Sequence, residues 1–266
     1  MEAAARLITR GLRYQLGQVL EASSPTQMWR YWKHSLLVDR AVPGRYLGRN
    51  QQSFLEESVA GALHSGTHLD GLGHIGIGPL TYNGYAYADI ISSEGLTKLG
   101  IESVPPIFTR GLLLDIPNAL GLPELSAEYE ITAGDIEKAI VLQQVRPGPG
   151  DVVLIHTGWG RLWGTDNSRY ARSEPGIEMS AAALLTEQRV AVIGADNWAV
   201  EVVYADPGDI LFPVHQHCIT KFGCYLLENV RTEELARDKV WEFCCVILPI
   251  RLKGASASMV SPVGLT

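Results

Sequence analysis

The sequence predicts a single α/β domain in which strands and helices alternate along the chain. Apolar runs of strand length occupy residues 107–116, 151–156 and 190–195, and segments with helical spacing separate them at 132–145 and 180–189. This alternation is typical of an α/β domain and not of a β-sandwich or a helical bundle. The chain has 266 residues, 46% of them apolar, which is enough for one large core. No internal repeat, low-complexity tract or linker divides the sequence.

Within this one domain, residues 1–266, the first 53 residues are expected to form a helix and a long ordered excursion. Apolar residues recur at helical spacing between residues 1 and 22, at Leu7, Ile8, Leu12, Leu16, Val19 and Leu20. Residues 23–53 have no sustained period and include Trp29 and Trp32. Long connecting segments of this kind often line binding or catalytic sites. The catalytic core is predicted to span 54–266.

The core contains a regular series of further elements. Thr132 followed by Asp135 is the pattern of a capping box that opens a helix, and Ser180 is in position to cap another. A Pro-Gly turn at 147–150 precedes a strand. The expected strands are 54–63, 107–116, 151–156, 190–195 and 242–248, and the expected helices are 132–145, 180–189 and 233–238.

Composition and charge exclude several classes of partner. The formal net charge is −7 and the sequence pI is near 5.5, whereas nucleic acids and anionic membranes require clustered Lys and Arg. No apolar run approaches the roughly 18 residues of a membrane span. The four cysteines form neither a CxxC pair nor a disulfide framework, which is typical of reduced thiols in the cytoplasm. We expect a cytoplasmic protein that acts on a small molecule, with no nucleic-acid or membrane partner.

The densest group of chemically active residues is the segment 64–74, His-Ser-Gly-Thr-His-Leu-Asp-Gly-Leu-Gly-His, which holds three of the seven histidines. Its three glycines would each cost a helix roughly 1 kcal/mol, so a loop that folds around an ion is favoured. His68 and Asp70 are two residues apart and share one face of an extended segment. Together with His64 they supply ligands that suit Zn²⁺ or Mn²⁺. The alternative for any single histidine is a hydrogen-bonded structural role.

The pattern His-x-Gly-Thr-His-x-Asp-x-x-x-His resembles the signature of the cyclase family of metal-dependent hydrolases, which includes bacterial kynurenine formamidase, isatin hydrolase and a trans-dienelactone hydrolase. The resemblance covers roughly residues 50–262. It extends to blocks at 82–84, 109–115, 150–154 with 157–159, 194–197, and 212–215 up to Glu228-Asn229. It implies a swivelling β/β/α fold, with a mixed, partly barrel-like sheet flanked by helices, and a homodimer or homotetramer.

The resemblance also implies the roles of the histidines in the motif. His64, His68 and Asp70 become ligands of a divalent metal, and His74 becomes the acid/base. Leu72 stands where kynurenine formamidases usually carry Pro. Together with Gln216, which stands where a later His is expected, this departure favours cyclic substrates, lactones or lactams, over aryl formamides.

A second metal site is implied for part of the family, where a later His and a Glu complete it. Glu228 matches that Glu. Counting back from Gly223 puts Gln216 at the position of the later His, with His215 and His217 on either side. Either of these histidines is a candidate, and one ion per chain is favoured over two.

A divalent ion with an open position lowers the pKa of bound water to about 7, which gives hydroxide, and it polarises a carbonyl. We expect hydrolysis of a C–O or C–N acyl bond, with His74 moving the proton. One alternative is a metal-dependent cyclase or dehydratase, a lyase that acts on a polyketide-like intermediate. Another is a non-catalytic protein that binds a metal or a ligand. The sequence has no GxSxG elbow and no Walker loop.

Four further side chains are candidates for substrate contacts. Trp29, Trp32 and Trp159 would line a planar substrate, with core packing as the alternative. Arg110 would pair with a substrate carboxylate, with a strand-end ion pair as the alternative.

Overall fold

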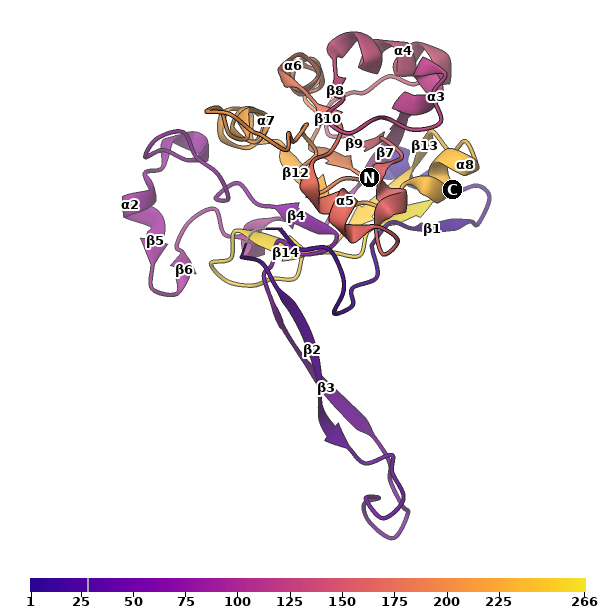
Figure 1. Cartoon of the computed structure of the whole chain (residues 1–266), viewed down its shortest axis with the longest axis vertical. Helices are drawn as coiled ribbons and strands as arrows, with labels where there is room; N and C mark the ends of the chain where they lie inside the picture. Colours follow the sequence, from indigo (N-terminus) through magenta and orange to yellow (C-terminus); the bar gives the residue numbers. More distant parts are fainter. Residues whose placement is uncertain (28) are drawn as a thin grey trace.

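The fold is built around one mixed sheet of nine strands that curls into half of a barrel (Figure 1). The computed structural model describes residues 1–27 and 29–266. In spatial order the strands are β1 (Arg13–Gln15), β15 (Val263–Leu265), β13 (Glu242–Ile247), β7 (Ile107–Asp115), β9 (Val152–His156), β11 (Val192–Ala195), β12 (Tyr225–Glu228), β4 (His68–Asp70) and β14 (Ala257–Met259). The predicted mixed, barrel-like α/β architecture is therefore confirmed.

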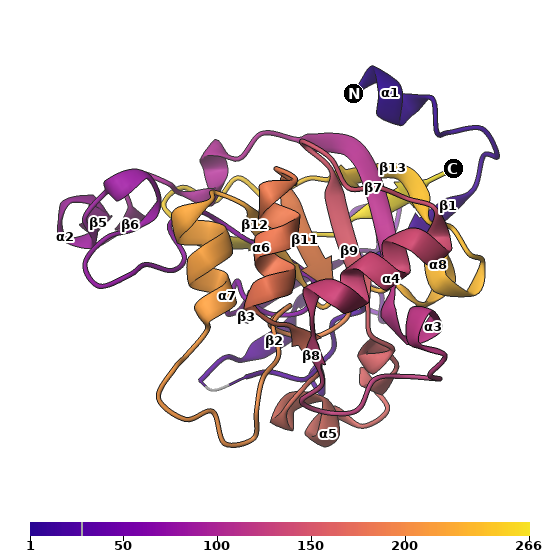
Figure 2. The ribbon, with the colours of Figure 1, turned by 90° about the horizontal axis from the view of Figure 1, so that it is seen from above.

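Helices cover one face of this sheet (Figure 2). Strands β7, β9, β11 and β12 are parallel neighbours, and parallel neighbours need crossover connections, which are usually helical. The helices in these crossovers are α3 (Ile116–Leu120), α4 (Ala133–Gln143), α5 (Asn167–Arg172), α6 (Met179–Glu187), α7 (Pro213–His215) and the π-helical turn η4 (Gln216–Lys221). The remaining sheet neighbours are antiparallel.

The core has two parts because the central strands are apolar on both faces. Leu112 and Leu114 of β7 pack under α4 and α6, whereas Leu113 between them faces the inside of the curled sheet. Phe243 of β13 lies in that second part. Apolar side chains therefore pack against both faces of the central strands.

The remaining elements lie outside the nine-stranded sheet. They are α1 (Glu2–Ala5), α2 (Tyr87–Ile90), α8 (Glu233–Arg237), the 3₁₀ turns η1 (Tyr82–Gly84), η2 (Ile101–Ser103) and η3 (Trp159–Leu162), and the strands β2 (Trp32–Asp39), β3 (Leu55–Gly61), β5 (Ile91–Ser92), β6 (Gly95–Leu96), β8 (Glu130–Ile131) and β10 (Gly176–Ile177). Across the described residues, every helix is too short or too polar to cross a bilayer.

Most of the elements predicted for the core are confirmed. Strands β3, β7, β9, β11 and β13 and helix α8 lie within the expected ranges, and Thr132 and Asp135 form the reciprocal capping box of α4. Helix α6 begins slightly earlier than expected, because Glu178 and not Ser180 is its N-cap.

The predicted N-terminal helix over residues 1–22 is wrong. Only Glu2–Ala5 is helical, and the chain turns at Gly11, whose φ of 66° is incompatible with a continuing helix. Tyr14 and Leu16 are buried instead as alternate residues in and beside β1, which pairs with β15 near the C-terminus. Long-range strand pairing therefore overrides the local helical period.

The predicted excursion contains a long two-stranded hairpin. Strands β2 and β3 pair from Trp32↔Gly61 to Asp39↔Leu55, and together with their connecting loop they form residues 32–61, here called the arm. The arm projects well away from the body of the protein (Figure 1).

Asp196 fixes the turn that follows β9. Its buried carboxylate accepts hydrogen bonds from the backbone N–H groups of Thr157 at 2.8 Å and Gly158 at 2.9 Å. The Thr157 hydroxyl also donates to it, at 2.6 Å. Burial raises the pKa of Asp196, but the neighbouring His156 and these donors outweigh it and lower that pKa below its usual value.

We expect Asp196→Ala to lower the free energy of unfolding by about 3 to 5 kcal/mol, because it leaves buried donors without a partner. Urea unfolding measures the loss. The exposed Asp206 provides the control, since Asp206→Ala should change stability by less than about 0.5 kcal/mol. Equal stability of the two variants would contradict the role of Asp196.

Candidate metal centre

The motif at residues 64–74 forms a tight loop that runs into strand β4. Gly66 has a φ of 59°, and a Cβ on it would lie 2.6 Å from Leu20 Cδ2, so this position requires glycine. Strand β4 lies between β12 and β14, with His68 opposite Glu228 in the register. The loop and the strand pairing thus bring groups distant in sequence against His68 and Asp70.

Imidazoles and carboxylates converge around Asp70, which is fully buried. Its Oδ1 lies 2.9 Å from His64 Nδ1 and 3.5 Å from His68 Nε2. Its Oδ2 lies 3.6 Å from His215 Nε2. Glu228 repeats this arrangement, with Oε2 3.1 Å from His68 Nε2 and Oε1 3.2 Å from His215 Nε2. Each carboxylate therefore lies between histidines, with His215 beside one oxygen and His68 beside the other.

Three of the four histidines have one ring nitrogen anchored outside the cluster. His68 Nδ1 donates to the Gly66 carbonyl at 2.8 Å, and His64 Nε2 lies 3.2 Å from Ser256 Oγ. His215 Nδ1 donates to Glu201 Oε1 at 2.5 Å. The opposite nitrogen of each ring faces inward, which is the usual arrangement of metal-ligating histidines.

His74 is the exception to this pattern. Among the described residues, neither of its ring nitrogens makes a hydrogen bond, and its Nε2 lies 3.7 Å from Asp70 Oδ2. The ring lies beside His64, with centroids 4.1 Å apart. Its side chain is 24% exposed, more than those of His64, His68 and His215. His74 therefore stands at the open side of the cluster.

The polar atoms inside the cluster fit a bound cation. His64 Nδ1, His68 Nε2, both Asp70 oxygens and Glu228 Oε2 are buried and make no aligned hydrogen bond, although they lie close together. Ligands about 2.0 to 2.2 Å from a tetrahedral zinc ion lie roughly 3.3 Å from one another. Two overlapping triads, His64–Asp70–His74 and His68–Asp70–Glu228, have donor atoms within 4.8 Å of each other. The donor set suits a divalent ion such as Zn²⁺ or Mn²⁺.

Both carboxylates are ionised at neutral pH. Burial alone would raise their pKa values, but the imidazoles of His74 and His64 hold the pKa of Asp70 well below its usual range. The imidazole of His68 likewise lowers the pKa of Glu228 to about 2. Negative charge is therefore fixed at the centre of the cluster.

A π-helical turn decides which later histidine reaches the cluster. The segment η4 accommodates an extra residue relative to a regular helix, so counting back from Gly223 fails by one position. His215, and not Gln216, faces Asp70 and Glu228. His217 lies outside the cluster, where its Nε2 hydrogen-bonds Thr186 at 2.9 Å.

Two of the side chains expected to contact substrate are engaged in other interactions. Trp159 is buried beside Tyr170 and donates to that residue's carbonyl. Arg110 is held by Asp151 at 2.6 Å and Glu242 at 3.1 Å. Trp159 therefore packs in the core and Arg110 forms ion pairs, which were the alternatives to substrate contact for these two side chains.

The other two tryptophans flank a contact with the metal-ligand loop. Between Trp29 and Trp32, the side chain of Arg30 donates to the His64 carbonyl at 3.0 Å. Trp29 is 85% exposed, and Trp32 begins the arm opposite Gly61. The predicted excursion therefore contacts the loop that carries His64.

Sequence reasoning assigned no role to several residues that position the cluster. Glu201 holds His215, and Ser256 holds His64. Asn229 donates to the same Gly66 carbonyl that accepts from His68, and in turn accepts from Tyr170. None of these residues carries a local signal, because each acts across a long sequence separation.

Comparisons with known proteins identify the family of the chain. The family model described as "Putative cyclase" matches residues 14–202, which is more than half of the chain. The chain belongs to the cyclase family. A crystal structure of a novel cyclase is 30% identical, with a TM-score of 0.91, and the alignment covers 100% of this chain and 90% of that one. No curated protein sequence matched the chain.

Solved structures of lower sequence identity share the fold. Isatin hydrolase A from Ralstonia solanacearum is 17% identical with a TM-score of 0.71, over 95% of this chain and 91% of that one. A predicted metal-dependent hydrolase from Bacillus stearothermophilus is also 17% identical, with a TM-score of 0.62, over 96% of this chain and 98% of that one. At these identities the likeness concerns the fold alone.

Glu201→Gln should weaken the affinity for Zn²⁺ or Mn²⁺ about tenfold, because the amide is a poorer acceptor for His215 Nδ1–H and orients the ring less firmly. Competition with a chelator measures the affinity directly. Glu130→Gln is the matched control, since Glu130 contacts Tyr204 and not His215. Unchanged affinity in Glu201→Gln would contradict this role.

Proposed function

We propose that this protein is a metal-dependent hydrolase that opens a C–O or C–N acyl bond of a small, cyclic or aromatic carbonyl compound. Lactones, lactams and aryl formamides are the substrate classes, with the cyclic ones favoured. The proposal rests on a contrast between two kinds of imidazole. The anchored imidazoles face buried carboxylate oxygens that make no aligned hydrogen bond. The imidazole of His74 has no anchor and lies at the open side of the cluster. The first set suits metal binding and the second suits proton transfer.

We assign one metal position to His64, His68 and Asp70. The sequence favoured a single ion because Gln216 stood where a ligand was expected. With His215 facing Asp70 and Glu228, a second position is available that shares Asp70, and we propose that the centre has room for two ions. A bound Zn²⁺ or Mn²⁺ supplies Lewis acidity to the substrate carbonyl and to water.

His74 moves the proton in the proposed reaction. Burial lowers the pKa of His74 to about 4, despite the opposing charge of Asp70, so the imidazole is neutral at pH 7. It accepts a proton from the attacking water as the new C–O bond forms. It then donates that proton to the leaving oxygen or nitrogen as the acyl bond breaks.

Substrate approaches from the side of His64 and His74, whose side chains are 15% and 24% exposed, whereas Asp70 behind them is fully buried. Arg30 holds the segment that carries Trp29 and Trp32 against the loop of His64, and we propose that these aromatic side chains contact a planar substrate. The proposal includes a small-molecule substrate, a cytoplasmic location and a homodimer or homotetramer.

His74→Ala should retain bound metal but lower kcat by about 10² to 10⁴-fold, because only proton transfer is removed. His64→Ala should instead lose metal, since it removes an inward-facing ligand. Elemental analysis of the purified variants, combined with turnover of a lactone, lactam, ester and formamide panel, separates the two effects. A His74→Ala variant with near-normal kcat would exclude the assigned role.

Reaction in ¹⁸O-labelled water should place one labelled oxygen in the acid product, as detected by mass spectrometry. Activity should disappear with a chelator and return with added Zn²⁺ or Mn²⁺. Product without label would favour the cyclase or dehydratase alternative. Metal-loaded protein that is inactive on the whole panel would favour a binding protein.

A further inference from the structure

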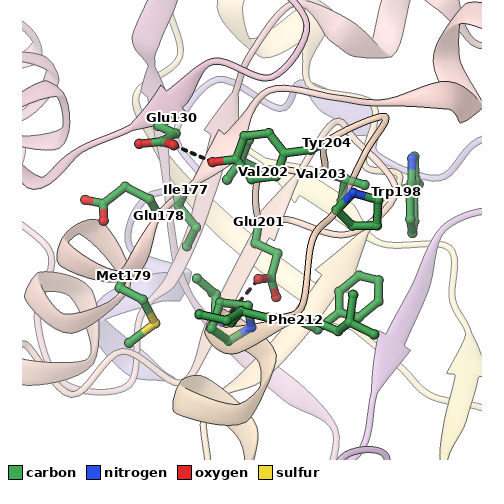
Figure 3. Close-up of a pocket in the computed structure, with 15 residues that line it drawn as sticks. Glu130, Ile177, Glu178, Met179, Trp198, Glu201, Val202, Val203, Tyr204 and Phe212 are labelled. Atoms are coloured by element: carbon green, nitrogen blue, oxygen red, sulfur yellow. Dashed lines mark hydrogen bonds between the residues drawn. The ribbon is translucent and has the colours of Figure 1, made fainter.

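A pocket is lined by the start of α6 and by residues 198–214, which run from the end of β11 into α7 (Figure 3). Its volume is about 540 Å³, which is within the range of small-molecule sites in proteins. His64 and His74, at the proposed opening for substrate, are not among the residues that line it. The proposed reaction therefore does not account for this pocket.

Most of the lining is apolar, and part of it is aromatic. Trp198, Tyr204 and Phe212 line the pocket together with aliphatic side chains. Two of the aliphatic ones, Ile210 and Leu211, are 76% and 58% exposed. Apolar side chains gain free energy when a ligand covers them, and aromatic side chains stack well on flat rings. The lining therefore favours an aromatic ligand.

The charged groups of the lining are all carboxylates. They belong to Glu130, Glu178 and Glu201, and no Lys or Arg among the described residues joins them. Glu130 accepts a hydrogen bond from the Tyr204 hydroxyl, and Glu178 accepts one from the Ser180 N–H. Glu201 accepts from two backbone N–H groups. The carboxylates repel an anionic ligand, and a cationic one would compete with these donors for their oxygens. An uncharged ligand meets neither cost.

Two residues of the pocket lining also contact His215 of the metal centre. Glu201 Oε1 accepts a hydrogen bond from His215 Nδ1 at 2.5 Å, and the ring centroids of Phe212 and His215 are 5.3 Å apart. Phe212 has a φ of 51°, which is rare for a bulky residue. Such conformations persist where the surrounding structure imposes them, often at ligand sites. The pocket lining is therefore also the support of the His215 ring.

We propose that this pocket binds an uncharged aromatic small molecule, and that its occupancy strengthens metal binding through Glu201 and Phe212. A ligand packed against these two side chains restricts their motion and holds the His215 ring in its inward-facing orientation. By thermodynamic linkage, a bound metal then strengthens ligand binding by the same factor. The linkage rests on the proposed metal centre, whereas binding of the ligand does not.

Two fluorescent dyes with the same ring system test the ligand site. N-phenylnaphthylamine is uncharged and anilinonaphthalene sulfonate is an anion, and both become brighter on leaving water for an apolar site. Titration of the purified protein gives a dissociation constant for each. The uncharged dye should bind at least tenfold more tightly, because the sulfonate faces the carboxylates of the lining. Glu130→Gln combined with Glu178→Gln should narrow this difference.

Tyr204→Ala removes an aromatic side chain from the lining and should weaken binding of N-phenylnaphthylamine at least fivefold. Tyr85→Ala is the matched control, since Tyr85 is 37% exposed and lies outside the lining. Circular dichroism shows whether both variants are folded. The ligand site is overturned if wild-type protein fails to bind the uncharged dye, if it binds the anion as tightly, or if folded Tyr204→Ala binds like wild type.

The linkage is tested by titrating the uncharged dye into chelator-treated protein and into the same protein loaded with Zn²⁺, as checked by elemental analysis. Loaded protein should bind the dye at least threefold more tightly, and Glu201→Gln should reduce this factor. Equal affinities in loaded and chelator-treated protein would overturn the linkage. Protein that binds the dye but no Zn²⁺ would contradict the linkage and the proposed metal centre together, while the ligand site would stand. The readout is fluorescence and not turnover.

Discussion

The burial of the Asp70 carboxylate is the constraint on which the site depends. A carboxylate with no exposure to water and no aligned hydrogen bond is costly unless positive charge surrounds it. Strand β4 carries Asp70 into the sheet between β12 and β14, and the imidazoles of His64, His68 and His215 gather around it. A divalent ion would offset the same cost more completely, which explains why inward-facing atoms are left unpaired in the protein itself.

The surrounding fold keeps these groups in position through contacts that are distant in sequence. The pairing of β4 with β12 sets Glu228 opposite His68, while Glu201 and Ser256 orient His215 and His64 from two other segments. Each anchor fixes which ring nitrogen faces inward. His74 lacks such an anchor among the described residues, and our proposal that it transfers protons while the other imidazoles bind the ion rests on this difference.

The sequence predicted those parts of the fold and site whose signals are local. Strands β7, β9, β11 and β13 are apolar runs, and the motif at 64–74 is contiguous, so both were evident without coordinates. The choice between His215 and His217 was not evident from the sequence, because the π-helical turn η4 shifts the register by one residue. The N-terminal helix was wrongly expected because an apolar period near 3.6 competes with pairing to β15 that only the folded chain supplies.

The central claim is that the cluster around Asp70 binds a divalent metal ion. Anomalous diffraction from crystals grown with Mn²⁺ tests it most directly, because the signal locates the ion independently of activity. The account predicts an anomalous peak among His64, His68 and Asp70, and a second peak beside His215 and Glu228 if both positions fill. Ordered protein with no peak at this cluster, or a peak only elsewhere, would contradict it.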